Sequence, residues 1–291
     1  MPSKANLSGT TLPRRQLGRA LRDARHAQGA TLEQVARDTE FSRATLSRIE
    51  LGQYERIKVR EVEYLCRHYG LSADRTTYLA GLASQANTKV WWQGYQHLLV
   101  PGYSTYLALE SSATEFHFFQ PLVVPGLLQT ADYVRTLQRL FAPDAPSEEI
   151  EKHVELREQR RRRVTQRHSR ARVEFLIHES ALHSVVGSNR IMAAQCHHIV
   201  DMSTRDNVVV RVLPFAVGVP AGSVVTPFII IDFPDNEPSV VYAEAAIGSM
   251  TFDDTEDVNN FRVLFDKLRN AALEEQHSRD RIRKIAGRFQ Q

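Results

Sequence analysis

Apolar residues recur every three or four positions through the first third of the chain, which predicts a bundle of short helices over residues 13–86. Five such stripes follow one another, carried by Leu17 and Leu21, Leu32 and Val35, Leu46 and Ile49, Val62 and Leu65, and Leu79 and Leu82. Thr31 has Gln34 three residues later, the pattern of a capping box, and Ser42 is placed to cap the third helix. Residues 1–12 are polar, and we expect them to be a disordered N-terminus.

Beyond residue 86 the pattern alternates between helical stretches and short runs rich in Val and Ile, which predicts a second domain of α+β class over residues 87–291. Strands are predicted at residues 172–177, 208–213, 226–233 and 239–243. Helices are predicted at residues 104–118 and 189–202, after Thr130, Ser147 and Ser180, and from residue 255. The apolar stretch 116–128 contains two prolines and a glycine, so it predicts a loop. Short strands separated by turn residues favour a small, mostly antiparallel sheet.

Charge is distributed unevenly between the two predicted domains. Residues 1–86 hold 14 Lys and Arg against 9 Asp and Glu, whereas residues 87–291 hold 23 against 25. Nucleic-acid binding depends on positive charge that displaces counterions from phosphates, so the first domain is the candidate for that role. Its excess of positive charge is modest, and we therefore expect strongly salt-dependent binding by a homodimer rather than tight binding by a monomer.

Two further properties of the chain bear on its compartment. It has no apolar run of membrane-spanning length and no hydrophobic leader, so we expect a cytoplasmic protein without a membrane partner. Cys66 and Cys196 are far apart in sequence, and each lies inside a helical pattern. We therefore expect two core thiols rather than a disulfide, in keeping with a reducing compartment.

The segment TLEQVARDTEFSRATLSRIELG, residues 31–52, predicts two short helices joined by a tight turn. Together with Leu17 and Leu21, it resembles the Xre and phage-repressor family of helix-turn-helix domains. Residues 45–52 are like that family's S-x-x-E-x-G ending of the recognition helix. Relatives usually have Gly where Glu40 stands in the turn, and Gln where Leu32 stands. The resemblance implies a lambda-repressor-like fold of five helices that binds double-stranded DNA.

The residues that would touch DNA follow from the geometry of such a helix, whose first turns face the base edges in the major groove. We predict that Arg43 and Arg48 bond guanines and that Ala44 contacts a thymine methyl group. Phosphate contacts are predicted for Ser42, Thr45, Ser47, Lys58 and Arg60. The alternative is that these arginines form a solvated helix face, and the motif around them favours DNA.

Five stretches of the second half carry a second resemblance: residues 107–137, Arg157 with the arginine run after it, and residues 175–187, 210–222 and 228–244. In order and spacing they resemble a domain of unknown function attached to Xre-type helix-turn-helix regulators of actinobacteria, antitoxin-like regulators among them. The resemblance implies a sensor or partner-binding module, and it names no ligand.

We therefore predict a sequence-specific DNA-binding transcription regulator, a homodimer on a two-fold operator, whose second domain senses a small-molecule ligand or a small partner protein encoded nearby. One alternative is an antitoxin-like protein that sequesters the partner protein and autoregulates its own operon. A second alternative is an enzyme fused to a DNA-binding domain. A pocket of polar, titratable groups would favour the enzyme, and an apolar pocket would favour a ligand sensor.

No motif in the chain predicts catalysis, a cofactor or a metal site, and we expect a protein that is not an enzyme. His178 and His183 resemble the histidines of a zinc-protease motif, but their spacing places them about 140° apart on a helix instead of about 40°. His197 and His198 follow Cys196, but adjacent helical residues point apart. The G-x-S-x-G, Walker A and G-x-G-x-x-G patterns are absent from the sequence.

Two arginine-rich segments remain. Residues 160–163 are four arginines on a predicted helix, where preceding acids offer ion pairs, so a solvated helix end is favoured over a DNA contact. The tail from residue 278 carries Ile282, Ile285 and Phe289 as an apolar stripe among basic residues. Because that stripe must be buried, we expect the tail to dock on protein rather than on DNA.

Overall fold

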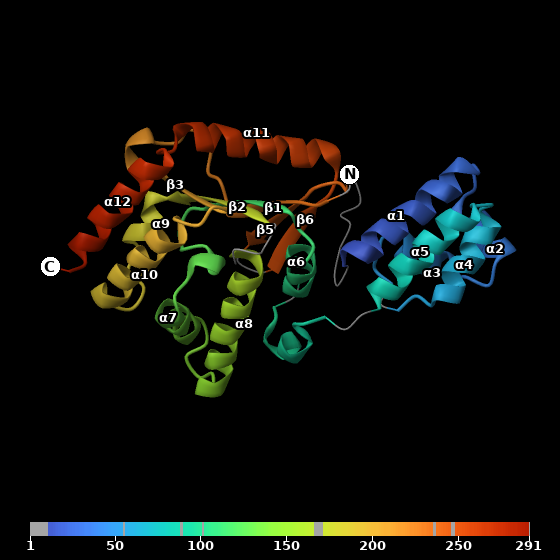
Figure 1. Ribbon diagram of the computed structural model, residues 1–291, viewed down its shortest axis with the longest axis horizontal. Helices are drawn as coiled ribbons and strands as arrows, with labels where there is room; N and C mark the ends of the chain where they lie inside the picture. Colours follow the sequence, from blue (N-terminus) through green and yellow to red (C-terminus); the bar gives the residue numbers. More distant parts are fainter. Residues whose placement is uncertain are drawn as a thin grey trace. The chain divides into compact units, whose positions relative to one another are not determined.

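The computed structural model describes residues 11–54, 56–87, 90–100, 102–165, 171–234, 237–245 and 248–290. Its contacts divide the chain into two compact units, Met1–Ser112 and Ala113–Gln291 (Figure 1). The boundary follows residue 112, whereas the sequence places the second domain from residue 87 onward. Of residues 1–12, which we expected to be disordered, residues 1–10 lie outside the described residues. The expectation is wrong at Leu12, which is buried and begins the first helix.

The first unit begins with five helices around one apolar core. They are α1 (Leu12–Ala27), α2 (Leu32–Asp38), α3 (Arg43–Glu50), α4 (Val59–His68) and α5 (Ala73–Ala86). Each helix buries its predicted apolar stripe, as the complete burial of Leu21, Val35, Leu46, Val62 and Leu79 shows. The predicted helical domain is therefore confirmed, with α2 and α3 as its helix-turn-helix. A 3₁₀ helix, η1 (Gln93–Leu98), and α6 (Tyr103–Glu110) complete the unit.

Side-chain caps fix where three of these helices begin. Thr31 accepts a hydrogen bond from the N–H of Gln34, whose own side chain accepts one from the N–H of Thr31. Ser42 and Ser72 each accept a hydrogen bond from the N–H three residues later. Caps of this kind stabilise a helix by about 1 kcal/mol each. The predicted starts of α2 and α3 are confirmed.

The second unit is built on one six-stranded sheet with the order β3-β2-β1-β4-β5-β6. Its strands are β1 (Glu115–Gln120), β2 (Arg172–His178), β3 (Val208–Leu213), β4 (Phe228–Asp232), β5 (Val240–Ala245) and β6 (Gly248–Phe252). Strands β1, β2 and β3 pair in parallel, and β4, β5 and β6 continue antiparallel from the other side of β1. The predicted α+β class with a mostly antiparallel sheet is confirmed.

Helices cover both faces of this sheet (Figure 1). They are α7 (Ala131–Phe141), α8 (Ser147–Thr165), α9 (Glu179–His183), α10 (Asn189–Met202), α11 (Thr255–Ala271) and α12 (Glu275–Arg288), with the 3₁₀ turns η2 (Gly126–Leu128) and η3 (Phe215–Val217). α11 runs along one face, and α7, α8 and α10 lie on the other. Phe265 and Leu268 of α11 pack with Phe119, Phe228 and Val241 of the sheet in one apolar core.

Two elements differ from the sequence prediction. Residues 115–118, predicted as the end of a helix, belong to β1, and β1 continues to Gln120 in the stretch predicted as a loop. A strand buried on both faces has a continuous apolar run rather than an alternating one, so periodicity does not distinguish it from a buried helix. Residues 248–252 carry no strand prediction and form β6, a half-exposed strand at the sheet edge.

The two arginine-rich segments have different outcomes. Ile282 and Ile285 of α12 are buried, and α12 packs on α10 and β3, so the predicted docking of the tail on protein is confirmed. In the other segment Arg162 and Arg163 are exposed, as a solvated helix end requires, but Arg160 is buried. That interpretation is therefore wrong for Arg160, because α8 packs one side of this run into the unit. Within the part of the chain that the structure describes, every helix is too short or too polar to span a bilayer.

Candidate nucleic-acid interface

α3 has one apolar side and one basic side. Leu46 and Ile49 are buried in the bundle, whereas Arg43, Ala44 and Arg48 are exposed. The three residues predicted to contact bases therefore share the solvent side of α3. A recognition helix requires this arrangement, because the side opposite the core is the one that enters a groove.

α3 is held to α1 by a buried ion pair that sequence reasoning did not identify. Arg25 donates from Nε to Oε1 of Glu50 over 2.6 Å and from Nη2 to Oε2 over 2.8 Å, and each residue is only 7% exposed. The hydrogen bonds to Glu50 raise the pKa of Arg25 above its ordinary value. Arg22 adds a hydrogen bond to the backbone carbonyl of Glu50. The glutamate of the S-x-x-E-x-G pattern therefore positions α3 from inside the bundle.

Two glycines let α3 lie where it does. A Cβ on Gly18 of α1 would stand 2.5 Å from the carbonyl oxygen of Ile49, so the two helices approach at a distance that only glycine permits. Gly52 follows α3 with φ of +69°, a left-handed conformation, and donates its N–H to the carbonyl of Ile49. This is a glycine C-cap, and it ends α3 where the sequence predicts.

Both arginines on the exposed side of α3 have neighbours within the unit. Nε of Arg43 lies 2.5 Å from Oε1 of Glu33 on α2, with both side chains more than half exposed. Nε of Arg48 donates to the carbonyl of Ala44 over 3.4 Å, and its guanidinium lies 5.8 Å from the ring centroid of Tyr54. Exposed contacts of this kind contribute at most about 1 kcal/mol. Either guanidinium can therefore exchange its neighbour for a base edge.

The residues predicted at phosphates fall into two groups. The Ser42 hydroxyl caps α3 by accepting from the N–H of Thr45, and the two hydroxyl oxygens are 2.9 Å apart. Ser47 is half-buried on α3. Lys58 and Arg60 are exposed at the start of α4. The two cations are therefore available to an outside partner, whereas Ser42 and Thr45 already serve the helix.

Arg56 is an exposed cation that sequence reasoning did not select. It lies in the loop between α3 and α4, close before Lys58 and Arg60. The loop carries no periodicity, so no pattern singled out Arg56; the available signal was its position directly after the recognition helix. Three exposed cations in this short stretch form a candidate surface for phosphates.

A second cluster of ionisable groups lies in the second unit, between the sheet and α11. Nδ1 of His117 on β1 is 3.4 Å from Glu174 of β2, and Nε2 is 3.6 Å from Asp232 of β4. The ring packs against Phe265 of α11. Burial opposes the charging of His117, but hydrogen bonds to Asp232 and Glu174 outweigh it and raise its pKa to about 9. The imidazole is therefore protonated at neutral pH.

Arginines balance the carboxylates of this cluster. Arg262 of α11 pairs with Asp232, and Arg211 and Arg269 lie 3.4 and 3.8 Å from Glu174. Burial would raise the pKa of Asp232, but hydrogen bonds from the imidazolium, a serine hydroxyl and a guanidinium hold it at about 2. The cluster thus joins four strands, β1 to β4, and α11 through paired charges.

The same cluster contains a group of described residues whose ligand atoms come within metal-binding reach of one another. Atoms of Glu115, His117 and Asp232 all lie within 4.8 Å of each other. A divalent cation there would have to displace the imidazolium proton and stand beside several guanidinium groups, which is electrostatically unfavourable. We therefore interpret the cluster as an internal ion network. Strand pairing brings these residues together from positions that are distant in sequence, so no sequence motif predicts the network.

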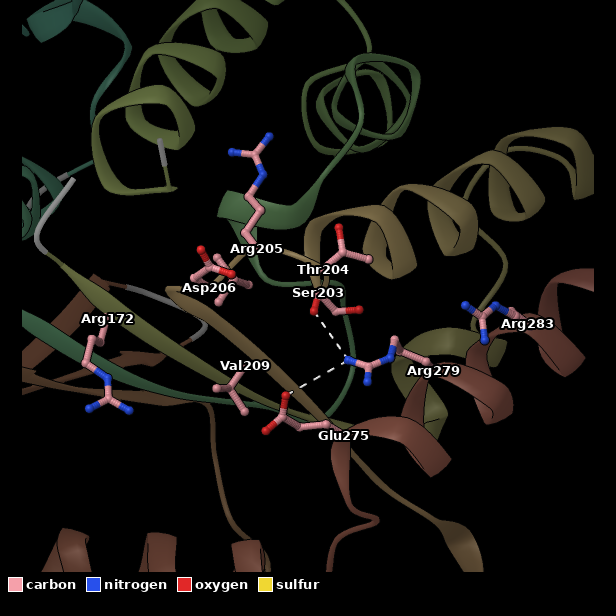
Figure 2. Close-up of a pocket in the computed structure, with 10 residues that line it drawn as sticks. Arg172, Ser203, Thr204, Arg205, Asp206, Val209, Glu275, Arg279 and Arg283 are labelled. Carbon is pink, nitrogen blue, oxygen red and sulfur yellow. Dashed lines mark hydrogen bonds and ion pairs between the residues drawn. The ribbon is translucent and has the colours of Figure 1, made fainter. Parts of the chain in front are cut away.

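A polar groove of about 580 Å³ lies between the α10–β3 turn and α12 (Figure 2). Arg172, Arg205, Arg279 and Arg283 line it, with the acids Asp206 and Glu275. Arg279 donates to the carbonyl of Ser203 and pairs with Glu275, whereas the side chains of Arg172 and Arg205 point away from Arg279 (Figure 2). The groove is basic at its rim, but its guanidinium groups do not converge on one point.

The histidines that sequence reasoning considered for zinc have other contacts. Nδ1 of His178 accepts from the N–H of Ser180 at the start of α9, and His183 lies 3.5 Å from Glu179. Glu179 is itself buried and accepts a hydrogen bond from the N–H of Phe215. These contacts tie α9 to the loop after β3. Burial, aided by a neighbouring arginine, lowers the pKa of His198 to about 4.

Both cysteines are buried free thiols, as predicted. Burial raises the pKa of Cys66 above its ordinary value and that of Cys196 to about 12. Both therefore behave as small core residues.

Comparison with known protein families gives two separate matches. A helix-turn-helix domain matches residues 16–79, which contain α2, α3 and the exposed basic side described above. A domain of unknown function, DUF5753, matches residues 103–284, more than half of the chain. No curated protein and no solved structure matches the chain. The helix-turn-helix match suggests DNA binding, and the chain belongs to the DUF5753 family.

Proposed function

We propose that the protein is a sequence-specific, DNA-binding transcription regulator. The observation that carries the proposal is the exposed side of α3, where Arg43, Ala44 and Arg48 stand on a helix that the buried Arg25–Glu50 pair holds in place. Base recognition requires side chains on a rigid element, because a mobile segment would lose conformational entropy when it is ordered on DNA. The helix-turn-helix match supports the same conclusion.

Each exposed residue has a definite role in this proposal. Arg43 and Arg48 donate to guanine O6 and N7, and Ala44 contacts a thymine methyl group. Arg56, Lys58 and Arg60 hold the phosphates that flank the groove, which fixes the register without reading sequence. The hydroxyls of Ser42, Thr45 and Ser47 approach the phosphate backbone of the DNA near the start of α3.

The regulator would act in the cytoplasm as a homodimer on a two-fold operator. α3 has eight residues, and a helix of this length reads only one half-site. The small excess of positive charge in the first 86 residues supports the same view, because one copy neutralises few phosphates. Two copies would supply both the affinity and the sequence length that specific regulation requires.

In this proposal the second unit is a binding module without catalytic activity, and it couples a signal to DNA binding. The groove beside α10 is polar, the lining expected of an enzyme, but its guanidinium groups do not converge on one point, so we take its arginines to favour an anionic ligand or an acidic partner protein over catalysis or an apolar small molecule. This favours, as the second candidate function, an antitoxin-like protein that sequesters a small partner protein and autoregulates its operon. Co-purification with the product of the neighbouring gene, lost on Arg172→Glu, would support it.

A mobility-shift assay on the DNA upstream of the protein's own gene tests the main proposal. Arg43→Ala and Arg48→Ala should each weaken specific binding and leave the fold unchanged, because both side chains are exposed. Arg190→Ala, an exposed arginine at the start of α10, is the matched control and should bind like the unaltered protein. Specific binding that survives both α3 substitutions would overturn the assignment of α3 as the reading helix.

A further inference from the structure

The two edge strands of the sheet in the second unit, β3 and β6, differ in how far the rest of the unit covers them. At one edge, β3 is covered: the N–H of Val212 donates to Oγ of Ser278, and the carbonyl of Val212 accepts from the N–H of Leu273, each over 2.9 Å. Both partners come from α12 and the segment before it. The outward backbone groups of Val212 are therefore satisfied from within the chain.

At the other edge, β6 pairs with β5 on one side only. Among the described residues, no helix or loop hydrogen-bonds to its outer side. Gly248 and Met250 are exposed, and Ser249, Thr251 and Phe252 are half-buried. β6 thus presents a row of backbone N–H and C=O groups for which the described residues provide no partner.

The composition of β6 makes this edge unusual. Natural proteins protect open edges with charged side chains, prolines or bulges, because an unprotected edge pairs with another strand. The five residues of β6, GSMTF, contain no charge and no proline. The next acids along the sequence, Asp253 and Asp254, lie beyond the strand, where Asp254 caps α11, and Glu244 of β5 lies on the inner side, opposite Ser249.

We propose that β6 is the interface between two copies of this chain, paired antiparallel about a two-fold axis through Met250. This inference rests on the proposed function, which requires a homodimer. The pairing would join the two six-stranded sheets into one continuous sheet. It deepens the proposal by assigning the dimer contact to a named strand of the second unit.

The register follows from the sequence of β6 and favours a second copy over an unrelated partner. With Met250 on the axis, Gly248 lies opposite Phe252 of the other copy, and Ser249 lies opposite Thr251. A small residue then faces the aromatic ring, two hydroxyl side chains face each other, and no like charges meet. Met250 is 44% exposed in the single chain, and pairing would cover it with its own copy. The strand is therefore complementary to itself.

Disulfide trapping tests this register directly. Opposed residues of an antiparallel pair have Cα atoms about 4.5–5.5 Å apart, which lies within disulfide range. Met250→Cys should therefore form a covalent dimer under mild oxidation. Val263→Cys on α11, where the residue is even more exposed at 55%, is the control and should stay largely monomeric on a non-reducing gel. The natural cysteines are buried, so they should not form intermolecular disulfides that compete with the designed one.

Met250→Lys gives an independent test, because two ammonium groups would meet on the axis and repel. Light scattering should show a dimer for the unaltered full-length chain and a monomer for this variant, with an unchanged circular dichroism spectrum. Affinity for a two-fold operator should fall about 100-fold with the loss of simultaneous binding. Val263→Lys should alter neither property.

The outcomes separate this inference from the proposed function. An unaltered chain that is monomeric at all concentrations, or a dimer that Met250→Lys leaves intact and Met250→Cys does not trap, would overturn the β6 interface. Either result can occur while Arg43 and Arg48 still control specific DNA binding. Conversely, a trapped dimer whose DNA binding is indifferent to those arginines would keep the interface and overturn the reading helix.

Discussion

Arg25 and Glu50 form a buried, two-pronged ion pair that joins α1 to the last turn of α3, with contacts of 2.6 and 2.8 Å. The pair lies on the core side of the recognition helix, opposite Arg43 and Arg48. It therefore determines the orientation of the exposed basic side of α3 from within the bundle. The geometry of α3, the proposed reading helix, thus depends on two buried residues rather than on exposed cations.

Removing one partner of this pair leaves a buried charge without compensation. Glu50→Gln should destabilise the first unit by about 3–5 kcal/mol, because Arg25 loses its carboxylate in a site that excludes water. The measurement is urea unfolding followed by tryptophan fluorescence and far-ultraviolet circular dichroism. The double variant Arg25→Met with Glu50→Leu removes both charges and should recover most of the loss. If the double variant is as unstable as the sum of the single changes, the pair is not the cause.

The close approach of α1 and α3 predicts opposite effects for two helical glycines. Gly18→Ala should destabilise the first unit by about 1–3 kcal/mol, because its Cβ would overlap the carbonyl oxygen of Ile49. Gly81→Ala on α5 is the matched control. No atom lies within 4 Å of its Cβ position, so helix propensity alone should stabilise the unit by about 0.5–1 kcal/mol. Equal effects at the two sites, measured by thermal unfolding, would contradict the close contact.

Phosphate and base contacts should be distinguishable by their salt dependence. Lys58→Ala and Arg60→Ala should weaken binding to all DNA sequences alike and lower the slope of log K against log salt by about 1 unit each. Arg48→Ala should instead cost about 1–3 kcal/mol on the specific site and relax the preference at one base pair. Fluorescence anisotropy titrations at several salt concentrations measure both. A uniform loss for Arg48→Ala would reassign Arg48 to the backbone.

The ion network beneath α11 predicts how the stability of the second unit varies with pH. His117 has its pKa raised from 6.5 to about 9 in the folded protein, so its stabilisation is complete below pH 6.5 and is lost as the pH rises through about 9. Asp232 has its pKa lowered from 3.8 to about 2, so its contribution is present above pH 3.8 and is lost as the pH falls through about 2.

Hydrogen exchange of amides in β1 and β4, corrected for intrinsic rates, reports this dependence. Between pH 6.5 and 9 the opening free energy should fall by at most about 1.4 kcal/mol per pH unit for one proton. His117→Gln keeps a hydrogen-bonding side chain but cannot be charged, and it should remove the slope in that range. A slope that persists in the variant would show that another group titrates there.

Much of the first unit follows from the sequence because its helices are short, amphipathic and capped by local residues. Thr31, Ser42 and Gly52 act within a few residues of their own position, and such signals survive in a single sequence. The second unit is harder to predict from the sequence. β1 is covered on both faces, so its apolar run had no period to identify it, and β6 is a half-polar strand whose neighbours in the sheet decide its conformation.

The candidate nucleic-acid interface likewise has one part that the sequence predicts and one part that it does not. The basic side of α3 could be placed from helical spacing, since the exposure of Arg43 and Arg48 follows once Leu46 faces inward. The groups that hold it could not, because Arg25 and Glu50 meet only when α1 packs on α3. His117 and Asp232 are likewise brought together by strand pairing across more than a hundred residues.

The burial of both thiols limits how the regulator can be controlled. Oxidants and electrophiles attack the thiolate, and burial raises the pKa of Cys66 and Cys196 and shields both from solvent. The chain has no third cysteine. Peroxide or thiol-reactive drugs should therefore leave both native thiols unmodified, so thiol chemistry is not the means by which an oxidative stress could reach the proposed regulator.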